Sequence, residues 1–499
     1  MRIGKNSIAY GAGVLALSGI SLQVISFAYR VVLARLAGEE GMALYQLSMQ
    51  VYLMLSALCI GGITLTVSNF TARARARGED GGQVVGFGIR LFLCLLILGG
   101  GTVILLGRPI SQRLLGDGRV YGAALLMVPC IALTGVENIL KAYFHGVRNL
   151  KAPIVSENTE IVARALAVCS LLVVVAPSRP GERAMLIVLG MILAEVISVT
   201  FLSTCFMRRK RGAPCRDRFG TFAASALPVS ASGLLTRALA SANTVLMPRA
   251  FMAAGLTQQA AMSTFGALTG MTIPMLFLPG CVLMPVLSVV TPKLSEDKQA
   301  QNEGDIRRKT GKVIHLTSLV MIPSMTLLAL FGRPLSQALY RSPLAGDWIA
   351  LLCPAILMAF YHSATGGILN GIGREKRASV SVCTEGGLLL AGTLILGGKL
   401  KWGVAGYVVS ELISNAVGMI LNMVWTVRYT GVRMQWFNWF GRPILASLAG
   451  AGAAWLTVWV ARVPEESFWL PLTVGALGFS VALRLLGTDA PAYLRKLIK

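Results

Sequence analysis

The chain has 499 residues, of which 55% are hydrophobic and only 14% are charged, and its mean hydropathy is +0.68. This composition excludes an ordinary soluble protein and indicates a chain that crosses a membrane many times. The net charge of +24 would suit nucleic acid, but the basic residues gather in loops between apolar segments, so no nucleic-acid partner is expected. The nine cysteines form no CxxC pair and the three histidines are isolated, so we expect no disulfide framework, metal centre or cofactor.

The apolar segments predict an all-α polytopic membrane protein with about 14 transmembrane helices, since a helix needs roughly 20 residues to cross the bilayer core. Strands are not expected, because lipid satisfies no backbone polar group and an open sheet cannot span. The predicted helices, in chain order, are 8–35, 42–71, 84–107, 119–144, 153–176, 184–207, 220–252, 262–292, 313–332, 347–370, 378–398, 402–427, 442–461 and 467–487.

The distribution of basic residues predicts the orientation of the chain. If the N-terminus is cytoplasmic, most lysines and arginines fall in loops and tails on the cytoplasmic side, as the positive-inside rule requires. Both termini of this multi-pass protein are therefore expected on the cytoplasmic side of the cell membrane. The basic segment 208–218 and the longest hydrophilic loop, 293–312, lie on the same side.

Three short patterns occur twice, in the same order and at a nearly constant separation. The equivalent residues are Arg35 and Arg249, Gly146 and Gly371, Glu160 and Glu385, and Glu195 and Glu411. They predict two six-helix repeats, an N-terminal lobe 1–207 and a C-terminal lobe 219–430. The linker 208–218 joins them, and 431–499 adds two helices and a cytoplasmic tail. Duplicated bundles with a cavity between the halves are typical of secondary transporters.

Arginines inside predicted helices are the candidate substrate-binding residues, because a charge within the bilayer is costly unless it faces protein or water. Arg30 and Arg237 lie deepest in their helices, and Arg35 and Arg249 lie near the helix ends. For the last two, snorkelling to the interface is the alternative. A guanidinium forms bidentate bonds with phosphate, so the expected substrate is anionic and carries a pyrophosphate.

Acidic residues inside predicted helices are candidates for ion coupling or gating. Glu160 and Arg164 are four residues apart, so an intrahelical ion pair is the alternative. Glu195 and Glu411 occupy equivalent positions of the repeat, and hydrogen bonding to a neighbouring helix is their alternative. Glu137 is the remaining candidate for coupling to an ion.

Three prolines in the predicted helix 262–292, namely Pro274, Pro279 and Pro285, are candidate hinges for alternating access, with static kinks as the alternative. The chain contains no Walker A loop, no GxSxG and no HExxH motif. We therefore expect no catalytic residues and no enzymatic activity.

Several stretches resemble a known family. They are Phe27–Gly38 with the following Gly41–Gln46, Ala142–Gly146 with Pro153, and Glu160–Arg164. The chain resembles the polysaccharide-transporter branch of the multidrug/oligosaccharidyl-lipid/polysaccharide flippase superfamily, in which it is most similar to sporulation proteins related to the lipid II flippase. The resemblance covers most of the predicted helices and agrees with their number.

The resemblance implies two lobes that alternate access to a basic central cavity. It also implies that the cargo is an undecaprenyl-pyrophosphate-linked oligosaccharide or peptidoglycan precursor, used for cell wall, spore cortex or surface polysaccharide. The implied partners are this lipid-linked saccharide, the lipid bilayer, an ion gradient or membrane potential, and the enzymes of cell-wall synthesis.

Two departures bear on the cargo. The lipid II flippase has an Arg-Asp pair where this chain reads Tyr29-Arg30. The flippase also has a cavity arginine in the helix that corresponds to 262–292, whereas this chain has no charged residue there before Lys293. Two alternatives stay open, a cation-coupled multidrug exporter of the same superfamily and a membrane scaffold.

Overall fold

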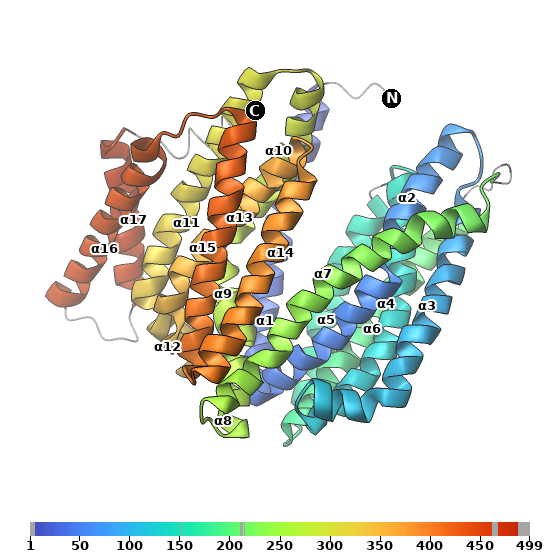
Figure 1. Cartoon of the computed structure of the whole chain (residues 1–499), viewed down its shortest axis with the longest axis horizontal. Coiled ribbons are helices and arrows are strands. Elements are labelled where there is room, and N and C mark those ends of the chain that lie inside the picture. Colours follow the sequence, from blue (N-terminus) through green and yellow to red (C-terminus); the bar gives the residue numbers. More distant parts are fainter. Residues whose placement is uncertain (1–4, 150, 210–212, 214, 462–467, 488–499) are drawn as a thin grey trace. The chain divides into compact units, whose positions relative to one another are not determined.

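The computed structural model describes residues 5–149, 151–209, 213, 215–461 and 468–487, and these residues are almost entirely helical (Figure 1). Within them the only β interaction is an isolated bridge between Glu79 and Ala213. The helices of the first half are α1 (Lys5–Cys59), α2 (Gly61–Ala76), α3 (Gly82–Pro109), η1 (Ile110–Leu114), η2 (Gly118–Val120), α4 (Tyr121–Gly146), α5 (Lys151–Val175), α6 (Pro180–Met207) and α7 (Phe219–Ala253).

The second half continues in the same style, with short π-helical turns inside or at the ends of long helices. Its helices are α8 (Gln258–Ala267), η3 (Leu268–Thr272), α9 (Ile273–Phe277), α10 (Gly280–Gln299), α11 (Glu303–Tyr340), α12 (Leu344–Asp347), α13 (Ile349–Gly371), α14 (Glu375–Gly392), η4 (Thr393–Lys399), α15 (Gly403–Thr430), η5 (Phe437–Gly441), α16 (Arg442–Ala461) and α17 (Trp469–Leu485).

The fold is that of an all-α polytopic membrane protein, as predicted. In the described part of the chain, 11 helical segments are long and apolar enough to span a membrane, and the shorter apolar helices include Phe219–Ala231 and Trp469–Leu485. One long segment, α1, contains the predicted helix 8–35 and the first part of the predicted helix 42–71, separated by a kink at Gly38, whose φ of 70° favours glycine. The second part of the predicted helix 42–71 forms α2. The number of about 14 stays a prediction.

The described residues form two compact units. One unit contains residues of 1–31, 253–255 and 267–499, and the other contains residues 32–252 and 256–266. The units therefore group the first 31 residues with the second half of the chain, and most of α7 with the first half. The lobe boundaries inferred from the repeat, 1–207 and 219–430, remain a prediction.

The unit that contains 32–252 is held together by close helix contacts at small residues. A Cβ at Gly135 of α4 would lie 2.1 Å from the ring of Phe92 on α3. On α6, a Cβ at Gly190 would lie 2.8 Å from the Cα of Val168. Such contacts let membrane helices pack by van der Waals attraction without a hydrophobic driving force.

The long helix α7 packs along the same unit, where it runs beside α2 (Figure 1). The amide of Gly62 donates a hydrogen bond of 3.2 Å to the Oγ of Ser230. Phe70 and Phe222 form an edge-to-face pair with ring centroids 5.6 Å apart.

The other unit is built around α11, α13 and α15, with α16 and α17 packed against each other beside α11 (Figure 1). A Cβ at Gly418 of α15 would lie 3.1 Å from the ring of His362 on α13. A Cβ at Gly450 of α16 would lie 2.6 Å from the carbonyl oxygen of Gly475 on α17.

The segment predicted as one helix, 262–292, is interrupted in the structure. Pro274 lies in the first turn of α9, and Pro279 immediately precedes α10. Pro285 lies inside α10, which continues without a break to Gln299. A role of these prolines as hinges stays a prediction.

Candidate functional site

A buried network of acidic and basic side chains joins α4, α5 and α6. The Nζ of Lys141 lies 2.9 Å from Glu137 Oε1 and 3.5 Å from Glu160 Oε2. A longer ion pair of 3.8 Å joins it to Glu157, whose side chain is half exposed. Lysine in this position neutralises carboxylates that would otherwise be costly to bury.

The second base of the network is Arg164. It forms an i,i+4 ion pair with Glu160 on α5 and lies 3.5 Å from Glu195 Oε1 on α6. The acid precedes the base by one helical turn in both Glu137–Lys141 and Glu160–Arg164, which is the favourable orientation on a helix. Local sequence spacing therefore aligns the charges within α4 and within α5, and packing of α5 on α6 adds Glu195.

Two serines complete the environment of Glu137. The hydroxyl of Ser156 donates to Glu137 Oε1 at 3.4 Å, and the hydroxyl of Ser198 donates to the same oxygen. The two hydroxyls also contact each other. Glu137 thus accepts bonds from both neighbouring helices and is 2% exposed.

The network holds more buried carboxylates than bases. Oxygen atoms of Glu137, Glu160 and Glu195 all lie within 4.8 Å of one another, with Lys141 and Arg164 as the bases beside them. The Oε2 of Glu195 has no hydrogen-bond partner among the described residues. The three buried carboxylates therefore exceed the two bases by one charge, and these bases contact the carboxylate oxygens that a metal ion would need.

A second buried polar cluster lies on α13, α14 and α15. The Nδ1 of His362 is 2.7 Å from Glu385 Oε2, and its Nε2 is 2.9 Å from the hydroxyl of Ser381. Glu411, one turn before Asn415 on α15, accepts a bond of 3.2 Å from the side-chain amide of Asn415. The sequence alone left His362 without an acidic partner, and the structure supplies one from the next helix.

The two clusters occupy equivalent positions of the repeat. When Gly146 is aligned with Gly371, Glu137 aligns with His362, Ser156 with Ser381, and Glu160 with Glu385. A separate match of the repeat relates Glu195 to Glu411. The candidate coupling residues are therefore divided between two sites, with Glu137, Glu160, Arg164 and Glu195 at one and Glu411 at the other. Sequence reasoning missed Lys141, although its i,i+4 spacing from Glu137 was a usable signal.

The candidate substrate-binding arginines are placed separately. Arg30 is exposed on α1. Arg237 is exposed on α7 and Arg35 on α1. Arg30 and Arg237 belong to different units, so their joint action stays a prediction.

Arg249 has a local role in the structure. Its guanidinium donates to the carbonyl oxygens of Arg113 and, at 2.9 Å, of Leu114, at the end of η1. It also lines a cavity of about 520 Å³ between α1, α3 and α7, whose walls are mostly aliphatic, such as Leu58 and Leu98. These bonds hold the guanidinium against the backbone.

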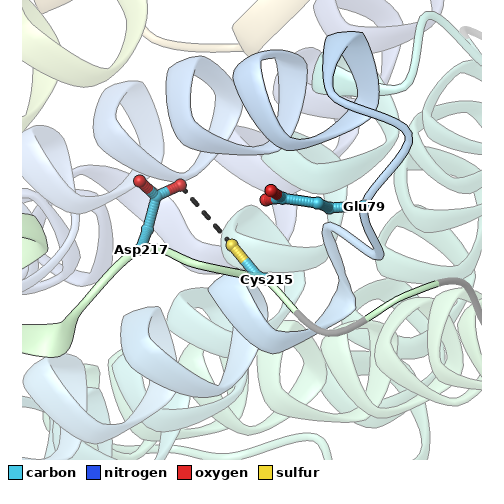
Figure 2. A group of neighbouring side chains, drawn as sticks. All are labelled: Glu79, Cys215 and Asp217. Carbon is cyan, nitrogen blue, oxygen red and sulfur yellow. Dashed lines mark hydrogen bonds between the residues drawn. The ribbon is translucent and has the colours of Figure 1, made fainter.

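The basic linker contacts the loop between α2 and α3. Figure 2 shows Glu79 of that loop beside Cys215 and Asp217 of the linker. Arg77 lies between the acids, 2.9 Å from Glu79 and 2.6 Å from Asp217, and this contact lowers the pKa of Glu79. Burial raises the pKa of the Cys215 thiol. A neutral thiol and two carboxylates bound to arginine do not fit a metal ion.

Comparison with known proteins places the chain in a family. Residues 8–298 match the family of polysaccharide biosynthesis proteins. The chain is 22% identical to stage V sporulation protein B of Bacillus subtilis over 436 residues, which cover 84% of this chain and 82% of that protein. It is 20% identical to sporulation protein YkvU of Bacillus subtilis over 385 residues, 75% of this chain and 84% of that protein.

Solved structures share the fold. The lipid II flippase MurJ in an inward-closed conformation matches with a TM-score of 0.68 and 14% identity, over 97% of this chain and 100% of that one. A multidrug resistance MATE transporter of the MOP superfamily, in an inward-facing conformation, matches with a TM-score of 0.68 and 15% identity, over 83% and 98%. Since the family model covers more than half of its length, the chain belongs to the polysaccharide biosynthesis protein family.

Proposed function

We propose that this protein is a flippase that moves an undecaprenyl-pyrophosphate-linked oligosaccharide or peptidoglycan precursor across the cytoplasmic membrane. The supporting observation is the contrast between its intramembrane acids and bases. Glu137, Glu160 and Glu195 are buried, with Lys141 and Arg164 beside them. By contrast, Arg30 and Arg237 are exposed on apolar helices.

This contrast favours an anionic cargo. An exporter of organic cations needs accessible carboxylates, whereas Glu137, Glu160 and Glu195 are buried beside Lys141 and Arg164. An exposed guanidinium inside the bilayer is stabilised only by water or an anion. Arg30 and Arg237 would each bind a phosphate of the pyrophosphate through charge-assisted hydrogen bonds.

The relatives support the proposed cargo, and the buried network supports the proposed coupling. One similar protein is named a stage V sporulation protein and another a lipid II flippase, which supports a cell-wall or spore-cortex precursor. The network of Glu137, Glu160 and Glu195 would take up a proton during the cycle, and enzymes of cell-wall synthesis would supply the lipid-linked saccharide.

The test is flipping of a fluorescent undecaprenyl-pyrophosphate disaccharide in proteoliposomes that contain the full chain. Arg30→Gln and Arg237→Gln should each slow flipping about tenfold or more, because a hydrogen bond to a charged group contributes roughly 1.5–3 kcal/mol. Arg90→Gln is the matched control, since Arg90 is also exposed on an apolar helix, α3, and should leave the rate within about twofold.

Equal flipping by all four proteins would support the flippase but would overturn the proposed role of Arg30 and Arg237 in binding the cargo. The flippase itself would be overturned by an absence of flipping by folded wild type together with uptake of an organic cation against a proton gradient, which would identify a drug exporter. No transport of either kind would favour the scaffold.

A further inference from the structure

A basic pocket lies in the unit that contains residues 267–499, away from the two clusters described above. Its volume is about 430 Å³, and it lies between the first turns of α11 and the chain that follows α15. The side chains that line it include Arg307, Arg308, Lys312, Arg433, Gln435 and Trp439. Four of these six are cationic.

The pocket is built by close backbone approaches. Gly431 ends α15 with a φ of 64°, and its amide donates a bond of 3.0 Å to the carbonyl of Val427. A Cβ at Gly431 would lie 3.1 Å from Arg307 Nε, and a Cβ at Gly311 would lie 2.8 Å from the indole of Trp439. Two glycines therefore bring the cations and the indole together.

The charge of the pocket is only partly balanced. Arg307 pairs with Glu303 at 3.2 Å and Arg308 with Asp305 at 2.8 Å. Both arginine side chains are more than half exposed, so these pairs are weak and an incoming anion can compete for the guanidinium groups. Lys312 has a contact of its own, so the balance is taken over the arginines. The three arginines of the pocket face two acids, which leaves one positive charge for the single negative charge of a phosphodiester.

Aromatic side chains beside the pocket indicate the level of the membrane interface. Trp439 is 6% exposed and packs on Ile314 and Val432, which anchors one wall in the core. Its neighbours Trp436 and Phe437 are 64% and 60% exposed. Exposed tryptophan and phenylalanine next to arginine are typical of the headgroup region, where the ring is solvated at one end.

We propose that this pocket binds the phosphate headgroup of an anionic phospholipid of the surrounding bilayer, such as phosphatidylglycerol. Arg307 and Arg433 hold the phosphate, and the indole of Trp439 supports the glycerol. Basic pockets between helices on the cytoplasmic side of membrane proteins bind anionic headgroups in this way. The lipid would fasten the start of α11 to the segment between α15 and α16.

Three features favour a bilayer phospholipid over the transported lipid or a soluble anion. The pocket is lined by one unit alone, the exposed aromatic residues place it beside the headgroups, and its excess charge matches a phosphodiester. The proposal does not depend on the proposed transport function, because its test measures lipid binding and not flipping.

The test is native mass spectrometry of the full-length protein in detergent, titrated with phosphatidylglycerol or with phosphatidylcholine. The double substitution Arg307→Gln/Arg433→Gln should weaken phosphatidylglycerol binding about 30-fold, since each basic residue near a headgroup contributes a factor of about five. Lys298→Gln/Lys376→Gln is the matched control. It removes two exposed cations outside the pocket and should change binding less than about twofold.

One further variant tests whether charge is the cause, and two displacement measurements identify the ligand. Arg307→Lys/Arg433→Lys keeps the charge and should retain most of the binding, which separates loss of charge from loss of fold. Equal binding to the double glutamine variant and the wild type would overturn the proposal. Displacement of phosphatidylglycerol by millimolar phosphate or pyrophosphate would assign the pocket to a soluble anion. Displacement by equimolar undecaprenyl-pyrophosphate disaccharide would assign it to the cargo.

Discussion

Lys141 is the residue whose loss should damage the buried network most. Its side chain is 12% exposed, and Glu137, its nearest partner, is 2% exposed. Replacement by methionine keeps an unbranched side chain but removes the amine. Glu137 then has only the serine hydroxyls as hydrogen-bond donors, and Glu160 loses one of its ion pairs. Breaking a buried ion pair by removing one partner costs about 3–5 kcal/mol.

That free energy converts into a measurable shift of the melting temperature. For a unit of this size, 1 kcal/mol corresponds to roughly 2–4 °C, so Lys141→Met should lower Tm by on the order of 10 °C. The measurement is thermal unfolding of the purified protein in detergent, followed by intrinsic fluorescence. Lys151→Met, at the exposed start of α5, is a control that should shift Tm by no more than about 2 °C.

The double variant Glu137→Gln/Lys141→Met decides whether charge is the cause. It removes both members of the pair, so no unpaired carboxylate remains at that position, and it should recover at least half of the lost stability. A Tm unchanged by Lys141→Met alone would refute the argument that the lysine neutralises the carboxylates. A double variant no more stable than Lys141→Met would instead assign the loss to packing.

Two further perturbations address helix packing and the linker. Gly135→Ala should destabilise the protein by about 1–3 kcal/mol because its Cβ meets the phenylalanine ring of α3, whereas Gly101→Ala, which meets no atom within 4 Å, should be neutral in the same unfolding assay. Arg77→Gln should speed maleimide labelling of Cys215 several-fold at pH 7, and unchanged labelling would show that this arginine does not hold the linker. The same contact lowers the pKa of Glu79 from its usual value of 4.5. Docking of the linker should therefore be complete above pH 4.5 and weaken as the pH falls through the lowered pKa of Glu79, and hydrogen exchange of the loop between α2 and α3 would measure this change.

The sequence predicted the membrane fold well because hydrophobicity and length alone decide whether a helix can span a bilayer. The sequence could not locate the break between α9 and α10, because a membrane helix can contain a proline and remain continuous, as α10 does at Pro285. The break near Gly38 was predicted, since one helix was expected to end at 35 and the next to begin at 42, but the sequence did not reveal that the two helices would join through a kink.

From the sequence, the contacts of the candidate site could be predicted only between residues on the same helix. Glu160 and Arg164 are one turn apart and were found from spacing. The contact of Glu195 with Arg164 depends on how α5 packs on α6, and the pair of His362 with Glu385 on how α13 packs on α14. Nothing in local sequence specifies those packings, so both contacts required the structure.

The duplication explains why buried charge is found at matching places in both halves, and the differences between the halves show how each manages it. The bases of the first cluster, Lys141 and Arg164, correspond to Gly366 and Leu389, which carry no charge. Its acid Glu137 corresponds to His362, so the second cluster sets one imidazole against two carboxylates.

The first cluster therefore sets a lysine and an arginine beside three buried carboxylates. The second cluster has a single imidazole, and the hydroxyl of Ser381 and the amide of Asn415 supply further hydrogen bonds. Because the two clusters share no residue, a substitution in one leaves every partner of the other in place, so the contribution of each to stability can be measured separately.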